Sequence, residues 1–425
     1  MLKSQGQTSA TLEMDTSSCH GKIFLLFSST LVLLLAALAI GAPSRALAKR
    51  NPAHARVKVF DVRKFGAVGD GKTENSKAFL DAWRQACQYK GAYRRRLYVP
   101  LGTYRLWPVV FEGPCAGLII VTIKGVLKGP DDPSTFSLSH WITFQYIDGM
   151  RIHGGGTLDG QGHHAWPYNK CACSPLPISV RLNFVNNTII KSISSVDSKN
   201  FHFNLFSCHN LEFRRMQIIA PDESPNTDGI HIGDSSRIKI IDSQIKTGDD
   251  CVSIGPGSKD IEIVGVHCGP GHGFSVGSLG KYPNEADVTG LSVRQCTMTG
   301  SQNGVRIKTW ASPLKSRAYN FSFHDITMRD VHRPIIIDQE YCPKGGCSAQ
   351  AASNVQIEDI LFSKIKGTSA SQVAVDLICS PSVPCKNINL RDINLEYTGS
   401  KGPVKSICAH VRGNVRGVQK PSPCI

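Results

Sequence analysis

Short segments in which apolar and polar residues alternate recur along most of the chain, and most of them begin with Asn or Asp. The first apolar residues of these segments are Leu211, Ile238, Ile261, Leu291, Phe321, Val355 and Ile388, in steps of 23 to 34 residues. Alternation with period 2 predicts β-strands that bury one face, and a repeat of this length indicates a solenoid of stacked strands. The segments lack the frame of a leucine-rich repeat, and hairpin turns do not recur at the spacing of a β-sandwich. The pattern therefore predicts an all-β fold, a single parallel β-helix.

The segment before the repeat predicts a short capping helix. Between Thr73 and Gln88 the apolar residues fall on one helical face, and Thr73 is the expected N-cap. The apolar residues of this face are Phe79, Leu80, Trp83, Ala86 and Cys87. Because the open end of a solenoid exposes its core, this helix should cover the N-terminal end.

The first residues predict export from the cytosol. Residues 23–42 carry no charge, follow Lys22 and precede Ala46-Leu47-Ala48, which has the small-x-small pattern of a signal peptidase site. About 20 apolar residues can also span a bilayer, so an uncleaved membrane anchor is the alternative. Both interpretations give a signal peptide or anchor (1–48), a short linker (49–57) and one β-helix domain (58–425), secreted or held outside the cell.

The cysteine count and the glycosylation sequons agree with export, and the net positive charge indicates the kind of partner. Hydrophobic content of 41% with 19% charged residues excludes a disordered chain. The chain has 15 Cys, and loss of residues 1–48 removes Cys19, so the even number that remains predicts that all pair in disulfides. Sequons at Asn186 and Asn320 offer N-glycosylation sites. The net charge of +15 indicates a polyanionic partner: nucleic acid, a membrane surface or an acidic polysaccharide.

Three six-residue segments in the middle of the repeat align without gaps. They are residues 228–233, 250–255 and 272–277, and their final glycines are 22 residues apart. The same offset places Asp228, Asp250 and His272 in one register, so strands about 4.8 Å apart would stack two carboxylates and an imidazole. A fourth segment, residues 303–308, fits after a longer turn.

The side-chain alternation predicts where the charged groups of these segments point. Ile230 should face the core, and an unbroken strand would bury Asp228 on the same side, so the chain must turn at Gly229. Arg306 and Lys308 alternate with apolar neighbours and should point outward. The sequence therefore predicts a carboxylate cluster beside a fixed pair of cations on one wall of the β-helix.

This cluster suits the hydrolysis of a glycosidic bond. One carboxylic acid must protonate the leaving oxygen, and a second carboxylate must activate water or attack the sugar. Asp228, Asp249 and Asp250 are the candidates, and crowding of like charges raises the pKa of at least one of them. The alternative is that these aspartates are only turn residues of a polar ladder. The convergence of four aligned segments on acids and cations favours catalysis.

At these residues the sequence resembles the plant-type polygalacturonases of glycoside hydrolase family 28. The matching segments are residues 224–232, 248–251, 268–273 and 305–310, with outlying matches at 65–71 and 155–162, so that the resemblance covers roughly residues 58–424. It implies a right-handed parallel β-helix that hydrolyses α-1,4 bonds between galacturonates in pectin with inversion, in the cell wall. The expected partner is pectic polysaccharide and not nucleic acid, the chain is expected to be a monomer, and no metal or organic cofactor is expected.

The resemblance also implies a role for each matching residue. Asp249 would be the general acid, and Asp228 and Asp250 would hold and activate the water. His272 would assist the acid, and Asn226 would orient the cluster. The residues that would contact the galacturonate are Arg306, Lys308 and Tyr341.

The cysteines allow several pairings. The resemblance implies a Cys251–Cys268 disulfide, and further expected pairs, which sequence cannot fix, are Cys87–Cys115, Cys342–Cys347, Cys379–Cys385 and Cys408–Cys424. Cys171 and Cys173, near His163 and His164, suggest a metal site, but oxidation of the cysteines is the favoured interpretation for a secreted chain.

Two other functions remain to be weighed. A pectate lyase or rhamnogalacturonan hydrolase shares this fold, but a lyase would use a basic residue and Ca²⁺, which the three aspartates do not suit. A catalytically inactive wall-binding protein would keep the fold and the basic surface and lack one of the acids, whereas this sequence has all three.

Overall fold

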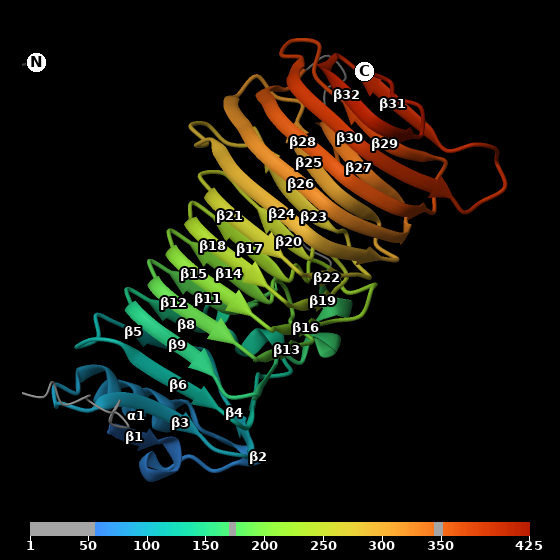
Figure 1. Cartoon of the computed structure of the whole chain (residues 1–425). Coiled ribbons are helices and arrows are strands. Elements are labelled where there is room, and N and C mark those ends of the chain that lie inside the picture. Colours follow the sequence, from blue (N-terminus) through green and yellow to red (C-terminus); the bar gives the residue numbers. More distant parts are fainter. Residues whose placement is uncertain (1–55, 170–175, 344–351) are drawn as a thin grey trace, which may run out of the picture. The chain divides into compact units, whose positions relative to one another are not determined.

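The computed structural model describes residues 56–169, 176–343 and 352–425. Within them the chain forms a right-handed parallel β-helix in which strands follow one another in chain order from β1 to β32 (Figure 1). Every strand pairing between these coils is parallel, and the described residues form one compact unit. The predicted fold class is confirmed.

One sheet of the β-helix contributes one strand per coil and forms the wall on which the charged residues lie. Its strands, in spatial order, are β5 (Val109–Glu112), β8 (His140–Gln145), β11 (Ile178–Asn183), β14 (Phe203–Phe206), β17 (Ile230–Gly233), β20 (Val252–Ile254), β23 (Phe274–Leu279), β25 (Asn303–Trp310), β27 (Arg333–Tyr341), β29 (Val373–Ile378) and β31 (Lys405–Ala409). We call it the cleft sheet.

The second sheet contains the remaining strands and closes the coil behind the cleft sheet. They are β1 (Val57–Asp61), β2 (Asp70–Glu74), β3 (Arg94–Val99), β4 (Thr103–Arg105), β6 (Ile119–Ile123), β7 (Val126–Lys128), β9 (Asp148–His153), β10 (Thr157–Asp159), β12 (Asn186–Lys191), β13 (Ser194–Val196), β15 (His209–Arg214), β16 (Gln217–Ile219), β18 (Ser236–Ile241), β19 (Gln244–Lys246), β21 (Lys259–Val264), β22 (His267–Cys268), β24 (Val288–Thr299), β26 (Lys315–Val331), β28 (Asn354–Ser369), β30 (Cys385–Tyr397) and β32 (Val411–Lys420). From β24 onward one long strand per coil replaces two short ones, because β24 pairs with both β21 and β22.

Helix α1 (Ser76–Gln88) packs against β1, β3 and β5 at the N-terminal end of the β-helix. Phe79 and Trp83 of its predicted apolar face are buried, which confirms the capping helix. The N-cap prediction is wrong: the cap residue is Asn75, because the hydroxyl of Thr73 donates to Asp70 at 2.7 Å instead. Four short 3₁₀ helices complete the elements: η1 (Val62–Phe65), η2 (Pro133–Thr135), η3 (Gly162–His164) and η4 (Trp166–Tyr168).

The predicted apolar ladder is confirmed over five coils and wrong at one position. Consecutive strands pair in register at Leu211, Ile238, Ile261, Leu291 and Phe321. The next partner of Phe321 is Ile360 and not Val355, and Ile360 in turn pairs with Ile388. The residue before Ile360 is Asp359, whose φ of 56° matches the turn residues of the neighbouring coils, whereas Asn354 does not have a positive φ.

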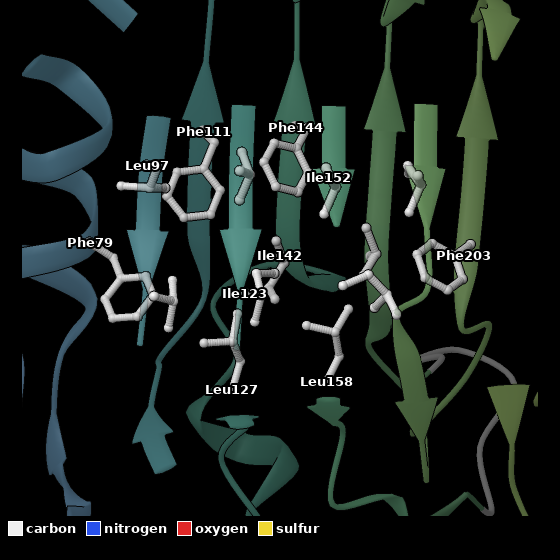
Figure 2. A pocket seen from close by; sticks show the side chains of 15 residues that line it. Phe79, Leu97, Phe111, Ile123, Leu127, Ile142, Phe144, Ile152, Leu158 and Phe203 are labelled. Atoms are coloured by element: carbon white, nitrogen blue, oxygen red, sulfur yellow. The ribbon is translucent and has the colours of Figure 1, made fainter. Parts of the chain in front are cut away.

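The space inside the first coils is filled almost completely by apolar side chains (Figure 2). Phe79, Phe111, Phe144 and Phe203 point into it from α1 and from the cleft sheet, and a cavity of about 30 Å³ remains between them and their aliphatic neighbours. Because its lining offers water no hydrogen-bonding partner, we assign this cavity to core packing and not to a ligand.

Four of the predicted cysteine pairs are confirmed as disulfides. The observed pairs are Cys87–Cys115, Cys251–Cys268, Cys379–Cys385 and Cys408–Cys424. The prediction that all cysteines pair is wrong, because Cys208 and Cys296 are free thiols buried in the core. Cys342 is disulfide-bonded. Its predicted partner Cys347 lies outside the described residues.

Two further predictions also lie outside the described residues. They are the signal peptide or anchor (1–48) and the cysteine pair Cys171 and Cys173. Within the ranges that the structure describes, every helix is too short or too polar to cross a membrane.

Candidate active site

The aligned segments lie in adjacent strands of the cleft sheet. Ile230 of β17 pairs with Val252 of β20, which pairs with Phe274 of β23, which pairs with Val305 of β25. The register of 22 residues is therefore confirmed. Each of the first three strands begins two residues after Asp228, Asp250 or His272, so these side chains occupy the turns that enter the sheet.

Asp250 is the most deeply buried carboxylate of the site, with 2% of its surface exposed. It accepts hydrogen bonds from Ser275 at 2.7 Å, from Arg306 at 2.8 Å and from Lys308 at 2.9 Å. Burial alone would raise the pKa of Asp250, but the charges of Lys308 and Arg306 outweigh it and lower this pKa to about 2. Asp250 is therefore ionised at any physiological pH.

Arg306 and Lys308 point outward from β25, as predicted, yet they are only 9% and 7% exposed. Both turn back toward Asp250, and Arg306 also donates through Nε to the Ser275 hydroxyl at 2.9 Å. One carboxylate faces two cations, so the group keeps one net positive charge at the wall. That remaining charge is what the pair offers to an anionic ligand.

Asp228 lies one coil before Asp250 in a different environment. It is 5% exposed and accepts one side-chain hydrogen bond, from Ser253 at 2.6 Å. Burial and the negative charges of Asp249 and Asp250 raise the pKa of Asp228 well above its usual range. Among the described residues, Asp228 thus has no cation in direct contact, whereas Asp250 in the next coil has two.

His231 contacts the serine that donates to Asp228. Burial lowers the pKa of His231 to about 4, so the imidazole is neutral near pH 5 and above. Its Nδ1 lies 2.8 Å from Ser253 Oγ. Because the single hydroxyl proton of Ser253 goes to Asp228, His231 must donate this bond.

Asp249 is the most accessible aspartate of the cluster, with 18% of its side chain exposed. One oxygen accepts the backbone N–H of Asp250 at 2.8 Å and lies 2.9 Å from Nδ1 of His272. The other oxygen accepts a longer bond from Asn226 at 3.3 Å. This second oxygen has only that one longer bond, whereas the first has two close partners.

Two aromatic side chains, Trp310 and Tyr341, lie at the C-terminal ends of strands β25 and β27. Nζ of Lys308 lies 5.3 Å from the ring centre of Tyr341, and this ring meets Trp310 edge-on with centres 5.5 Å apart. Tyr341 thereby joins the cation pair. The structure brings together all eight site residues that the sequence predicts, from the turns before β17, β20 and β23 and from strands β25 and β27.

Sequence analysis missed the hydroxyl groups that connect the cluster. Ser253 and Ser275 each donate to the aspartate of the preceding coil. Their signal was present, because both stand at the fourth position of their aligned segments, 22 residues apart.

Asp249, Asp250 and His272 place potential metal-ligand atoms within 4.8 Å of one another. Asp250, however, already binds Arg306 and Lys308 through both oxygens. A divalent cation would have to enter beside two positive charges, which makes this a poor donor set. That the protein needs no metal stays a prediction.

A parallel β-helix that presents clustered acids of unequal pKa beside cations is typical of enzymes that hydrolyse glycosidic bonds. Residues 87–418 match the family model Glycosyl hydrolases family 28, and the chain belongs to that family. It is therefore a glycoside hydrolase.

Named relatives and solved structures extend the comparison. The chain is 46% identical over 370 residues to a polygalacturonase of Gossypium barbadense, covering 86% of this chain and 90% of the relative. It is 44% identical over 369 residues to an exopolygalacturonase of Platanus acerifolia, covering 86% and 97%. The endo-xylogalacturonan hydrolase structure from Aspergillus tubingensis superposes with a TM-score of 0.74 at 23% identity, covering 85% of this chain and all of that one. At that identity the superposition supports the fold alone.

Proposed function

We propose that this protein is a polygalacturonase that hydrolyses α-1,4 bonds between galacturonates in pectin, with inversion at the anomeric carbon. The observation that carries the proposal is the unequal surroundings of neighbouring acids: two cations hold Asp250 ionised, while burial and the charges of Asp249 and Asp250 raise the pKa of Asp228. A hydrolase of this class needs an ionised base and a protonated acid in the same site.

Asp249 acts as the general acid. Asp228 and Asp250 are almost fully buried, whereas Asp249 is the most exposed of the three and can reach a glycosidic oxygen. It donates its proton to the glycosidic oxygen as the bond from that oxygen to C1 breaks. His272 and Asn226, which contact its two oxygens, orient the carboxyl group for this transfer.

Asp250 and Asp228 act on the water. The ionised carboxylates accept the proton of a water molecule as its oxygen bonds to C1 from the opposite face of the sugar. Because the pKa of Asp228 is raised, this carboxylate is the better proton acceptor once it has ionised. After the step Asp249 has lost one proton and the carboxylate that activated the water has gained one. Exchange of these protons with solvent returns the enzyme to its starting state.

The remaining positive charge of Arg306 and Lys308 binds a galacturonate carboxylate, and Tyr341 packs against the same sugar. A sugar carboxylate is the anion that suits a cation pair held on a rigid strand. The excess positive charge of the whole chain serves the same polyanion.

The site also bears on location and assembly. We infer that residues 1–48 direct secretion, that residues 58–425 form the catalytic domain, and that the enzyme acts as a monomer in the cell wall. The four observed disulfides support an oxidising compartment, because such bonds persist outside the cytosol.

The test is incubation of the secreted protein with polygalacturonate while reducing ends and ultraviolet absorbance are followed. We expect reducing ends without an unsaturated, absorbing product, and no loss of rate on addition of a chelator. An absorbing product or dependence on Ca²⁺ would show a lyase instead, and no product would contradict the proposal.

The variant Asp249→Asn should lower kcat by about 10²- to 10⁴-fold, the usual contribution of a general acid. Its melting temperature should stay within about 2 °C of the wild type, because the side chain is partly exposed. An aryl galacturonide, whose leaving group needs no proton, should recover most of the lost rate. Recovery in Asp228→Asn and not in Asp249→Asn would move the acid to Asp228.

A further inference from the structure

Lys281 is an exposed cation that the proposed mechanism does not use. It follows the end of β23 (Phe274–Leu279) by two residues, on the edge of the cleft sheet where the strands end. Among the described residues no carboxylate forms an ion pair with it. It therefore differs from Arg306 and Lys308, which are buried and share Asp250.

The loop around Lys281 is held by one glutamate. Backbone N–H groups of Gly280, Lys281 and Tyr282 donate to the Glu285 carboxylate at 2.6, 2.9 and 2.8 Å. The acid nearest in sequence is thus occupied by main chain, and the ammonium of Lys281 remains available. Three bonds to one side chain also hold the backbone from which the Lys281 side chain extends.

The ammonium lies over an aromatic platform that adjoins the catalytic cluster. Nζ of Lys281 is 5.5 Å from the ring centre of Trp310 and 5.1 Å from that of Tyr282. Trp310 lies two residues beyond Lys308 on the same face of β25 and pairs with Tyr341 of β27. Lys308 and Lys281 therefore contact different rings of one aromatic pair, Lys308 the ring of Tyr341 and Lys281 the ring of Trp310.

The opposite edge of the cleft sheet carries the opposite charge. An open groove of about 570 Å³ beside His272 is lined by Asp222 and Glu223, which precede β17, and by Asp330 near the end of β26. A carboxylate is therefore attracted more strongly to the edge of Lys281 than to this groove.

From these contacts we propose that Lys281, with Trp310 and Tyr282, forms a second carboxylate-binding subsite, which takes a galacturonate other than the one at Arg306 and Lys308. The rings pack against the apolar face of the sugar, and the ammonium pairs with its unesterified carboxylate. This inference rests on the proposed function, since it names a further position for the same substrate.

The test compares Lys281→Gln, Lys281→Arg and the wild type on polygalacturonate. We expect Lys281→Gln to raise KM by about 3- to 10-fold with kcat within twofold, the signature of lost uniform binding by a partly exposed charge. Lys281→Arg should restore most of the affinity. Lys386→Gln, which removes an exposed lysine of β30 in the other sheet, is the matched control and should leave KM unchanged.

A binding measurement separates this inference from the proposed function. In the Asp249→Asn background, titration calorimetry with hexagalacturonate should show the same 3- to 10-fold loss for Lys281→Gln. The fully methyl-esterified hexamer should bind both proteins equally, because its esterified carboxyl groups carry no charge to pair with the Lys281 ammonium. If the wild type cleaves polygalacturonate and Lys281→Gln matches it in KM and in hexamer affinity, the subsite is wrong while the function stands. If the wild type neither cleaves nor binds polygalacturonate, both fail.

Discussion

Asp228 and Asp250 lie one coil apart and are both buried, yet their surroundings shift their pKa values in opposite directions. The difference comes from two cations that reach Asp250 alone. A buried carboxylate that is ionised without a cation in direct contact destabilises the fold, and one held between two cations stabilises it. The two aspartates therefore make opposite predictions for the pH dependence of stability.

Asp228→Asn should raise the melting temperature at neutral pH while it abolishes most activity. The folded-state pKa of Asp228 lies above its unfolded value, so wild-type stability falls as pH rises from about 4 through that folded pKa. The amide cannot ionise and still accepts the bond from Ser253, so the advantage of the variant should grow across that window and then level off. Thermal melts from pH 3 to 8 measure it, and a variant less stable than the wild type at pH 7 would contradict the assignment.

Asp250→Asn is the matched comparison and should have the opposite sign. The pKa of Asp250 is lowered to about 2, so its stabilising contribution is present above pH 4 and is lost as pH falls toward 2. The amide leaves Arg306 and Lys308 without their anion, a loss of about 3–5 kcal/mol for a buried ion pair. The melting temperature should fall at pH 7 and approach that of the wild type near pH 2.

The turns between strands set the positions of the catalytic groups, and Gly248 shows how closely they pack. A Cβ at this position would overlap the carbonyl oxygen of Ser224 in the preceding coil, so the turn that carries Asp249 has no space for a side chain. Neither Gly248 nor Gly233, at the end of β17, has a left-handed φ. A Cβ on Gly233, however, would lie 3.7 Å from its nearest neighbour, the Leu205 oxygen.

Gly248→Ala should therefore displace the turn and lower kcat by about 10²-fold, the cost of moving a catalytic group by roughly 1 Å. It should also reduce the free energy of unfolding by about 1–3 kcal/mol. Gly233→Ala should change stability by less than about 1 kcal/mol, because no clash arises. Equal melting temperatures for the two variants would show that the turn has room to adjust.

The elements also show what sequence can predict and where it stops. Alternation and the repeat predicted the β-helix, because each strand must bury the same face in every coil. The misplaced position at Val355 arose because Asn354 and Asp359 both precede an apolar alternation, and only Asp359 adopts the left-handed turn. Which of two polar residues takes that turn depends on the coil beneath it.

The site was predicted as a set of residues but not as a network. Outward alternation correctly placed Arg306 and Lys308 on the wall of the site. That both bend back onto Asp250, 56 and 58 residues earlier, depends on side-chain rotamers, which alternation does not encode. Lys281 was not predicted as a site residue for the same reason. Its contact with Trp310, on a different strand, forms only when the coils stack.

At the scale of the whole molecule, residues 49–425 carry most of the chain's +15 charge, because residues 1–48 hold three basic and two acidic side chains. Charges of this kind attract an oppositely charged chain over a Debye length of about 10 Å at 0.1 M salt and of about 3 Å at 1 M. Binding of a long substrate should therefore weaken with salt more than binding of a short one, because more of its carboxylates lie within reach.

We expect KM for polygalacturonate to rise severalfold between about 0.05 and 0.5 M NaCl, with kcat nearly constant, because screening acts on association and not on the buried cluster. For digalacturonate or an aryl galacturonide the rise should be smaller than twofold. Initial rates at fixed pH measure both, and sodium sulfate at equal ionic strength controls for a specific effect of chloride. Equal salt dependence for long and short substrates would show that local contacts, and not the field of the whole chain, bind the polymer.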